Sequence, residues 1–363
     1  MKETIRRHLP LFIFSIFSLF CLAFLPFFSL FPSFSEWFAR YPARFVRLFL
    51  GYITSPLPFS LFEILIALFV LYILFLLFFI PISLYKKKKE KILPLLLVVP
   101  VLLCGVLDLF ALSFASSYYR VGTAEQMGLD TEVTEEDVFF ALESLVEITN
   151  DAAKNIEKNE KGESIPPSFD AVRTSVNKAA NDFGKRYPFY QNSGFEGKTF
   201  LSSPILTYTH LSGVFGFFTG EANVNTNYPH FIVTPSLAHE SCHARGIGPE
   251  NECNFLAAVI LMESEDPYLR YCGASFLLDD FISACRGIDK EKTNTILKDL
   301  DRTFFADMAF YSDFFQPYRD SFSSKVADTT NTAYLKAMGQ KDGVLSYSRV
   351  IGLTSAYFQQ KTP

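Results

Sequence analysis

The chain has 363 residues, 49% of them hydrophobic and 16% aromatic, which is too apolar for an ordinary soluble protein. The formal net charge is only -5, and outside the flanks of its apolar segments the sequence has no extended basic stretch interleaved with aromatic residues. This composition indicates a membrane protein and argues against nucleic acid as a partner.

Three apolar segments in the first third of the chain are long enough to cross a bilayer, which takes roughly 20 residues of helix. They lie at about residues 9–31, 58–84 and 92–114, so we expect residues 1–114 to form a membrane domain. A cleaved signal peptide is the alternative for residues 1–31, but the apolar run is too long and no small-x-small cleavage site follows it.

Basic residues in the short loops predict the orientation of these segments. Lys2, Arg6 and Arg7 precede the first segment, and lysines fill residues 86–89 between the second and third. Both places are expected in the cytoplasm, although arginines in the loop after the first segment oppose this. The prediction is a multi-pass protein of the cytoplasmic membrane, with membrane lipid as a partner and residues 115–363 outside.

Residues 35–51, between the first two apolar segments, have a two-faced helical pattern. Basic residues share one face and mostly aromatic residues the other, namely Arg40, Arg44 and Arg47 against Tyr41, Phe45, Leu48 and Phe49. This pattern predicts a helix lying in the membrane interface. A loop packed over the membrane helices is the alternative.

Residues 115–363, about 250 residues, are enough to bury a core of their own. Apolar residues recur at helical spacing through most of this region. Residues 190–234 are instead rich in aromatic and β-branched residues, and Gly213, Gly216 and Gly220 would each cost about 1 kcal/mol inside a helix. The expected fold class is mainly α with a small β element.

The stretch from Pro235 to Phe255, PSLAHESCHARGIGPENECNF, holds two of the five histidines in the chain. In a helix His239 and His243 lie one turn apart on the same face, so both imidazoles reach one Zn²⁺. Glu240 is rotated by about 100° from His239, which puts its carboxylate beside the metal, where it takes a proton from the water that the metal activates. The pattern therefore predicts a catalytic metal site.

A short reversal of the chain is predicted after the second histidine. Gly246 and Gly248 are able to end the first helix, and Pro249 suits the first turn of the next. Glu250 and Asn254 then share a face of the second helix, which makes Glu250 the expected third ligand and Asn254 a side chain that orients an imidazole. The fourth coordination position is left for water, as in catalytic zinc sites.

HESCHARG followed by ENECNFLAAVILM resembles the two-helix zinc site of zincin metallopeptidases whose third ligand is a glutamate. Their ExxAN or ExxAD pattern is matched by Glu250, Cys253 and Asn254, with cysteine in place of alanine. The resemblance implies a zincin-like α+β domain with one Zn²⁺ per chain, and it prefers Glu250 over Glu252 as third ligand. Glu252 would face about 200° away from Glu250 and remains the alternative.

More of the chain resembles the bacterial membrane proteins grouped as domain of unknown function 3810. The matching stretches are YYR after the third apolar segment, GFFTGEANVN at 216–225, the HExxH block, YLKAMGQ and GVLSYSRVI. This resemblance implies a zinc-peptidase-like architecture, and it implies no particular substrate.

Related peptidases place the edge strand that pairs with an extended substrate just before the HExxH helix, which corresponds to residues 216–225 here. We therefore expect Glu221, Asn223 and Asn225 to bind substrate beside an added strand. A structural turn held by the asparagine side chains is the alternative.

A zinc peptidase also needs a hydrogen-bond donor for the oxyanion of its tetrahedral intermediate. Tyr347 and Arg349 in SYSRV are the candidates, with His230 or His210 behind them.

These features together predict a membrane-anchored zinc metallopeptidase that hydrolyses peptide bonds in a peptide or protein substrate, with Glu240 as general base. A non-catalytic zinc-binding receptor or assembly protein is the alternative, but a structural site has no need of Glu240. An intramembrane protease is disfavoured because Ser236, Ser241 and Arg245 are poor residues to place in lipid.

Overall fold

The computed structural model of the chain describes residues 2–88, 92–191, 193, 196–319, 321–338 and 347–361. The chain is mainly helical, as expected, and divides into two compact units. The first unit consists of Met1–Arg120 and Gly216–Glu221, and the second of Val121–Phe215 and Ala222–Pro363. The first division lies close to the expected boundary at residue 114, whereas the sequence pattern does not indicate that residues 216–221 belong with the first unit.

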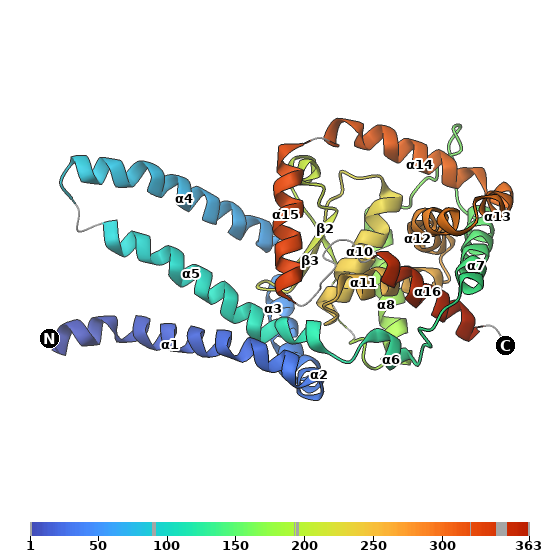
Figure 1. Cartoon of the computed structure of the whole chain (residues 1–363). Helices are drawn as coiled ribbons and strands as arrows, with labels where there is room; N and C mark the ends of the chain where they lie inside the picture. Colours follow the sequence, from blue (N-terminus) through green and yellow to red (C-terminus); the bar gives the residue numbers. More distant parts are fainter. Residues whose placement is uncertain are drawn as a thin grey trace. The chain divides into compact units, whose positions relative to one another are not determined.

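Three of the described helices are long and apolar enough to cross a membrane: α1 (Lys2–Leu30), α4 (Leu61–Tyr85) and α5 (Ile92–Ser113). They are the long helices of the first unit in Figure 1, and α1 packs against α5. Their bounds agree with the three predicted segments to within a few residues, apart from the start of α1. These helices indicate that the protein associates with a membrane.

The expectation of one helix over residues 35–51 is wrong, because this segment forms two helices. They are α2 (Pro32–Arg40) and α3 (Pro42–Thr54), and Tyr41 lies between them. Pro42 has no N–H to continue the ladder of α2, and its ring disfavours helical geometry at Tyr41. Each helix therefore begins with a proline in its first turn, where the missing N–H costs least.

The turn at residues 216–221 is held by helices of the first unit. The carboxylate of Glu221 accepts hydrogen bonds from the backbone N–H groups of Leu61 (3.1 Å) and Phe62 (2.8 Å), at the beginning of α4. Gly220 has φ of 73°, and a Cβ at this position would lie 2.7 Å from the backbone nitrogen of Gly51. Only glycine fits such a close approach of two backbones.

The second unit contains most of the helices and a small sheet. Its principal helices are α7 (Glu135–Ala153), α8 (Phe169–Arg186), α10 (His230–Ala244), α11 (Glu250–Met262), α12 (Pro267–Ile288), α14 (Arg302–Phe315), α15 (Phe322–Ala337) and α16 (Tyr347–Lys361), with the short helices α6 (Thr123–Met127), α9 (Ser203–Leu206) and α13 (Lys290–Ile296). The strands β1 (Lys198–Thr199), β2 (Gly213–Gly216) and β3 (Glu221–Val224) form a sheet in the order β1-β3-β2, with β1 parallel to β3. The predicted small β element is thus present, and β2 is an edge strand of the described sheet.

Helix α11 lies at the centre of the second unit, where it packs against α10 and α12 (Figure 1). Every residue from Phe255 to Met262 is buried, which accounts for a segment that is apolar all round its circumference. The first turn of α11 is polar by contrast and carries Glu250 and Asn254. The core therefore fixes the position of these two side chains through a helix that has no freedom to rotate.

Candidate metal centre and active site

A tight turn joins α10 to α11 and sets the angle between them. The N–H of Ile247 donates to the carbonyl of Cys242 (3.1 Å) and that of Gly246 to the carbonyl of His243 (2.9 Å), while Gly246 has φ of 89°. This is the Schellman arrangement, in which glycine ends a helix with a left-handed residue. Gly246 thus has the predicted role. Pro249 precedes α11 as its N-cap residue, one position before the predicted one.

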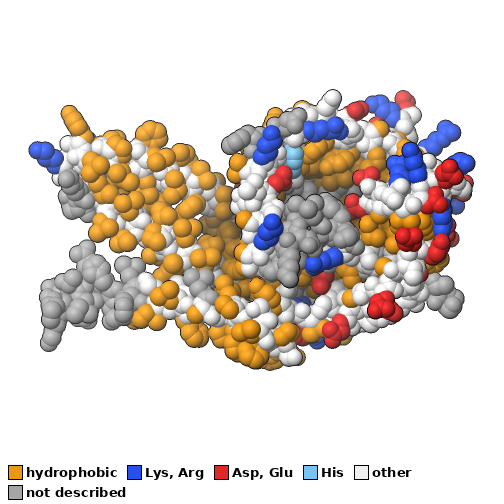
Figure 2. Space-filling model, in the orientation of Figure 1, with side chains coloured by type: hydrophobic (Ala, Val, Ile, Leu, Met, Phe, Trp, Pro, Cys, Tyr) orange, Lys and Arg blue, Asp and Glu red, His pale blue; other side chains and the backbone are white. Residues whose placement is uncertain are grey.

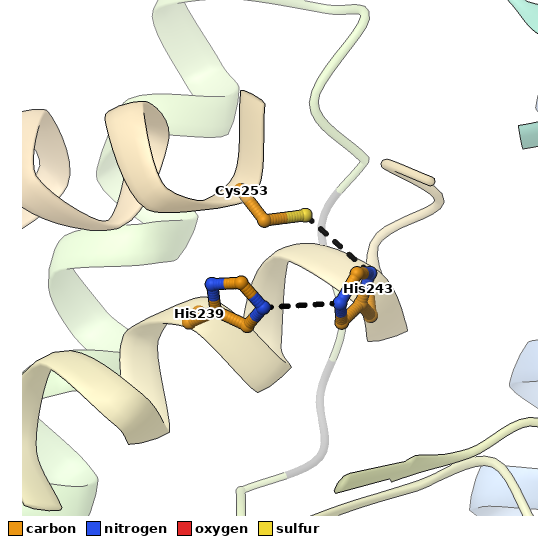
Figure 3. Close-up of side chains that lie close together, drawn as sticks. All are labelled: His239, His243 and Cys253. Atoms are coloured by element: carbon orange, nitrogen blue, oxygen red, sulfur yellow. Dashed lines mark hydrogen bonds between the residues drawn. The ribbon is translucent and has the colours of Figure 1, made fainter. Parts of the chain in front are cut away.

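Three side chains from the two helices converge on one point. The Nε2 atoms of His239 and His243 lie 3.1 Å apart, and Figure 3 shows the two imidazoles turned toward each other. The carboxylate of Glu250 lies 3.1 Å from Nε2 of His239 and 3.5 Å from Nε2 of His243. The i, i+4 spacing of the histidines and the turn between the helices therefore produce the predicted grouping.

Hydrogen bonds on the far side of each ring fix how the imidazoles point. Nδ1 of His239 lies 2.7 Å from Oδ1 of Asn254, and Nδ1 of His243 lies 2.9 Å from the carbonyl oxygen of Ile247. Both partners are acceptors, so each Nδ1 carries the proton and each Nε2 presents its lone pair to the shared point. Asn254 lies where the sequence analysis placed it.

The spacing of these atoms fits a tetrahedral zinc ion. Ligand bonds of about 2.0–2.2 Å at tetrahedral angles put neighbouring ligand atoms about 3.3–3.6 Å apart. The three observed separations are 3.1, 3.1 and 3.5 Å, which lie within or slightly below that range. The side chains of His239 and His243 are 14% and 8% exposed and that of Glu250 is 29% exposed, so the group is open on one side only.

The electrostatics of the group favour positive charge at the shared point. Burial lowers the pKa of His243, but the neighbouring Glu250 carboxylate outweighs it and raises the pKa of this imidazole to about 9. Burial also lowers the pKa of His239, but the hydrogen bond with Glu250 outweighs this effect and raises the pKa above its ordinary value. Burial raises the pKa of Glu250 itself, yet the two histidines hold it well below its usual range. The negative charge of the Glu250 carboxylate therefore outweighs the effect of burial on the pKa of both imidazoles.

Glu250 and Glu252, the two alternatives for the third ligand, have separate surroundings. Only Glu250 approaches the imidazoles. The carboxylate of Glu252 accepts a hydrogen bond of 2.5 Å from the hydroxyl of Thr123, at the beginning of α6. The geometry therefore favours Glu250, in agreement with the helical spacing.

Cys253 is a third neighbour of the histidines that the sequence pattern treated as a packing residue. The ligand atoms of His239, His243 and Cys253 all lie within 4.8 Å of one another. Figure 3 shows, however, that the Cys253 thiol approaches the Nδ1 side of His243, at 3.4 Å, while His239 lies on the Nε2 side. Because Nδ1 of His243 is already bonded to Ile247, a thiolate ligand would require the ring to turn.

Glu240 lies between the histidine pair and strand β2. Burial raises the pKa of its carboxyl group, which accepts a hydrogen bond from the backbone N–H of Phe215. A Cβ at Gly213 would lie 2.6 Å from Cγ of Glu240 and 2.7 Å from Oε1, so any side chain there would displace the carboxylate. The edge strand and the predicted general base therefore depend on a glycine for their close packing.

A pocket of about 350 Å³ opens onto this group of residues. Its walls come from α10, α11 and α12 and from the residues leading into β2, and they include Ser236, Phe276 and Asp280 beside the convergent histidine and glutamates. Burial, with a contribution from Asp279, raises the pKa of Asp280 to about 6. The sequence analysis missed Asp280, because nothing in the repeating pattern of α12 distinguishes it from a surface carboxylate.

The three residues predicted to bind substrate are buried and hydrogen-bonded. Glu221 caps α4, as described above. Asn223 is fully buried and donates to the carbonyl of Val214 (3.4 Å). Asn225 is also fully buried and donates to Thr207 (3.2 Å) and to the carbonyl of Leu211 (3.0 Å). These contacts favour the alternative, a turn held by its polar side chains, over direct contact with a substrate.

The oxyanion candidates lie at the beginning of α16. Val350 of the same turn lines the pocket, which places this helix end near His239 and Glu250. Arg349 is exposed, and the side chain of Tyr347 lies outside the described residues. His210 also lines the pocket, where its ring contacts the carbonyl of Tyr318 (2.8 Å). His230 lies at the other end of α10 and does not line this pocket.

Comparison with known proteins gives one match. A family model described as "Protein of unknown function (DUF3810)" matches residues 38–354, which covers part of the first unit, nearly all of the second and every residue of the candidate site. No curated protein and no solved structure shows significant similarity to the chain.

Proposed function

The chain belongs to the DUF3810 family, and from this premise we propose that it is a membrane-anchored zinc metallopeptidase. In this proposal the helices α1, α4 and α5 cross the cytoplasmic membrane, the N-terminus is inside and the second unit is outside. The basic residues in the first turns of α1 and the lysines between α4 and α5 support the orientation.

The observation that carries the proposal is the convergence of three ligand atoms beside a buried carboxylate. His239, His243 and Glu250 supply two nitrogens and one oxygen at separations suited to zinc, and one side of the group is open. A structural zinc site has four protein ligands, whereas three ligands with an open position are typical of catalytic sites.

The residues of the proposed zinc site have different roles in peptide hydrolysis. A zinc ion bound here would supply a Lewis acid that polarises the peptide carbonyl. Glu240 removes the proton from the attacking water and then gives it to the leaving amine. Burial raises the pKa of Glu240, which suits a group that must act first as base and then as acid.

An extended peptide is the substrate that best suits the edge of the sheet. β2 is an edge strand of the described sheet, and its first residue, Gly213, lies against Glu240. A peptide that added to β2 would have its backbone hydrogen-bonded by the strand and its scissile bond next to the general base. Tyr347 and Arg349 remain the proposed oxyanion donors, because α16 begins at the pocket.

Metal analysis of the purified full chain tests the site. We expect about one zinc per chain in the wild type and in Glu252→Gln, and a loss of zinc in Glu250→Gln, because only Glu250 faces the histidines. The two variants make the same chemical change two residues apart, so each is a control for the other. Absence of zinc from the wild type, even after reconstitution, would remove the proposal.

Cys253→Ser distinguishes the two possible ligand sets. Retention of zinc in this variant supports His239, His243 and Glu250 as the ligands. Loss of zinc in Cys253→Ser with retention in Glu250→Gln would assign the metal to the thiol instead and would remove Glu250 from the proposed ligand set.

A further inference from the structure

The helices α2 and α3 present a single stripe of exposed aromatic side chains. The members recur every three or four residues and continue without interruption through the junction between the helices. Their side chains are between 51% and 74% exposed: Trp37, Tyr41, Phe45, Phe49 and Tyr52. Neighbouring rings lie close together along the stripe, with centroids 6.4 Å apart for Trp37 and Tyr41 and for Phe45 and Phe49.

The opposite face of the same two helices is packed inside the first unit. Ala39 and Ala43 are fully buried. Arg47, which is 3% exposed, donates hydrogen bonds to the carbonyls of Ser113 (2.6 Å) and Ala39 (3.1 Å). The sequence pattern grouped Arg47 with Arg40 and Arg44 on one basic face, but the structure buries Arg47. These contacts fix the rotation of both helices about their axes, so the aromatic stripe faces away from the core of the first unit.

Connectivity places the stripe at a membrane surface. α2 begins two residues after the end of α1, and α3 ends seven residues before the beginning of α4. The segment is therefore tied at both ends to helices long enough to span the bilayer. Neither α2 nor α3 has the roughly 20 residues needed to cross it. Hydrophobic side chains cover much of the described surface of the first unit that faces the viewer in Figure 2.

We propose that the aromatic stripe of α2 and α3 lies in the boundary between the lipid headgroups and the acyl chains, and that phospholipid is its partner. Phe45 and Phe49 occupy its middle, while Trp37, Tyr41 and Tyr52 carry polar groups on rings that favour this boundary. A two-helix segment of this kind holds α1 and α4 at a fixed depth in the bilayer. The proposal goes beyond the peptidase activity and does not depend on it.

The fluorescence of Trp37 gives a direct test, because it is the single tryptophan of the chain. The full-length protein is reconstituted in phosphatidylcholine vesicles whose lipids carry bromine near the top or near the end of the acyl chains. We expect strong quenching by the shallow bromines and weaker quenching by the deep ones, since an interfacial helix buries its apolar face by about 5–10 Å. Aqueous iodide should quench only weakly.

Two relocated tryptophans calibrate the measurement. Trp37→Phe combined with Leu71→Trp reports from an exposed position near the middle of α4, and Trp37→Phe combined with Phe305→Trp reports from an exposed position on α14. The first should be quenched most by deep bromines and the second by iodide alone. If wild-type Trp37 behaved like the Phe305→Trp variant, the stripe would lie in water. Resistance of Trp37 to both quenchers would show that protein, such as a second copy of the chain, covers it, and either result would overturn the proposal.

Discussion

The helix pair α10–α11 and the hairpin formed by β2 and β3 lie next to each other in the sequence, and both were expected to carry function. In the helix pair, polar side chains from two turns of helix point to one place and leave their ligand atoms facing each other. In the hairpin, the polar side chains of Glu221, Asn223 and Asn225 bond to the backbone of their own surroundings. The polar side chains of the helix pair face one another, whereas those of the hairpin hold the local backbone in place.

The difference follows from how each element fixes the direction of its side chains. Residues four apart on a helix share a face whatever surrounds the helix, so the spacing alone predicts that His239 and His243 meet. In a short strand and its turn, the direction of a side chain depends on which neighbour covers each face. Polar residues in such a hairpin therefore indicate a function much less reliably than the same residues on a helix.

The strongest test of the comparison is Glu240→Gln in the helix pair. Loss of the general base should lower kcat/KM for peptide hydrolysis by about 10²–10⁴-fold. Zinc content and folding should remain unchanged, because Glu240 is not among the expected ligands. Turnover by Glu252→Gln at the wild-type rate is the matched control. Equal activity of Glu240→Gln and wild type would instead support the non-catalytic alternative.

Asn254→Ala tests how much the hydrogen bond that orients His239 contributes to the affinity for zinc. Without the acceptor at 2.7 Å, the ring of His239 loses the bond that orients it. We expect the affinity for zinc to fall by roughly 10- to 100-fold, as is usual for the outer partners of ligating histidines. Competition with a zinc chelator measures this change, and an unaltered affinity would show that the ring is held by packing alone.

Asn225→Ala tests the structural role of the hairpin. The substitution removes donors to Thr207 and to the carbonyl of Leu211, and we expect unfolding to become easier by about 1–2 kcal/mol. Zinc content and turnover per folded molecule should be retained, which thermal unfolding and activity assays together would show. A selective rise in KM without a loss of stability would return Asn225 to substrate binding.

Asp280→Asn should have the smallest effect, and its sign depends on pH. Burial raises the pKa of this carboxyl to about 6, so its ionisation opposes folding above that pH and has no effect below about 4, where the group is protonated in both states. The substitution should therefore stabilise the protein by about 1 kcal/mol at pH 7.5, after allowance for solvent screening. Melting temperatures at pH 7.5 and pH 4 measure the difference, and equal effects at both would contradict it.

Periodic features of the sequence predicted the parts of the molecule that depend on spacing. The three apolar helices, the strand-like segment around Gly213, the turn at Gly246 and the separation of Glu250 from Glu252 all follow from local geometry. The interruption at Tyr41 was also visible in principle, since Pro42 follows it. The remaining features depend on contacts between residues that are far apart in the sequence, which spacing does not reveal. Glu221 caps a helix 160 residues away in sequence, and Asp280 reaches the pocket from α12.

The single tryptophan gives the chain an optical property that affects every stability measurement on it. Trp37 belongs to the first unit, so a melting curve followed by tryptophan emission reports the unfolding of that unit alone. Far-ultraviolet circular dichroism detects the helices of both units. Transitions that fail to coincide would therefore show that the two units unfold separately, because each method reports a different part of the chain.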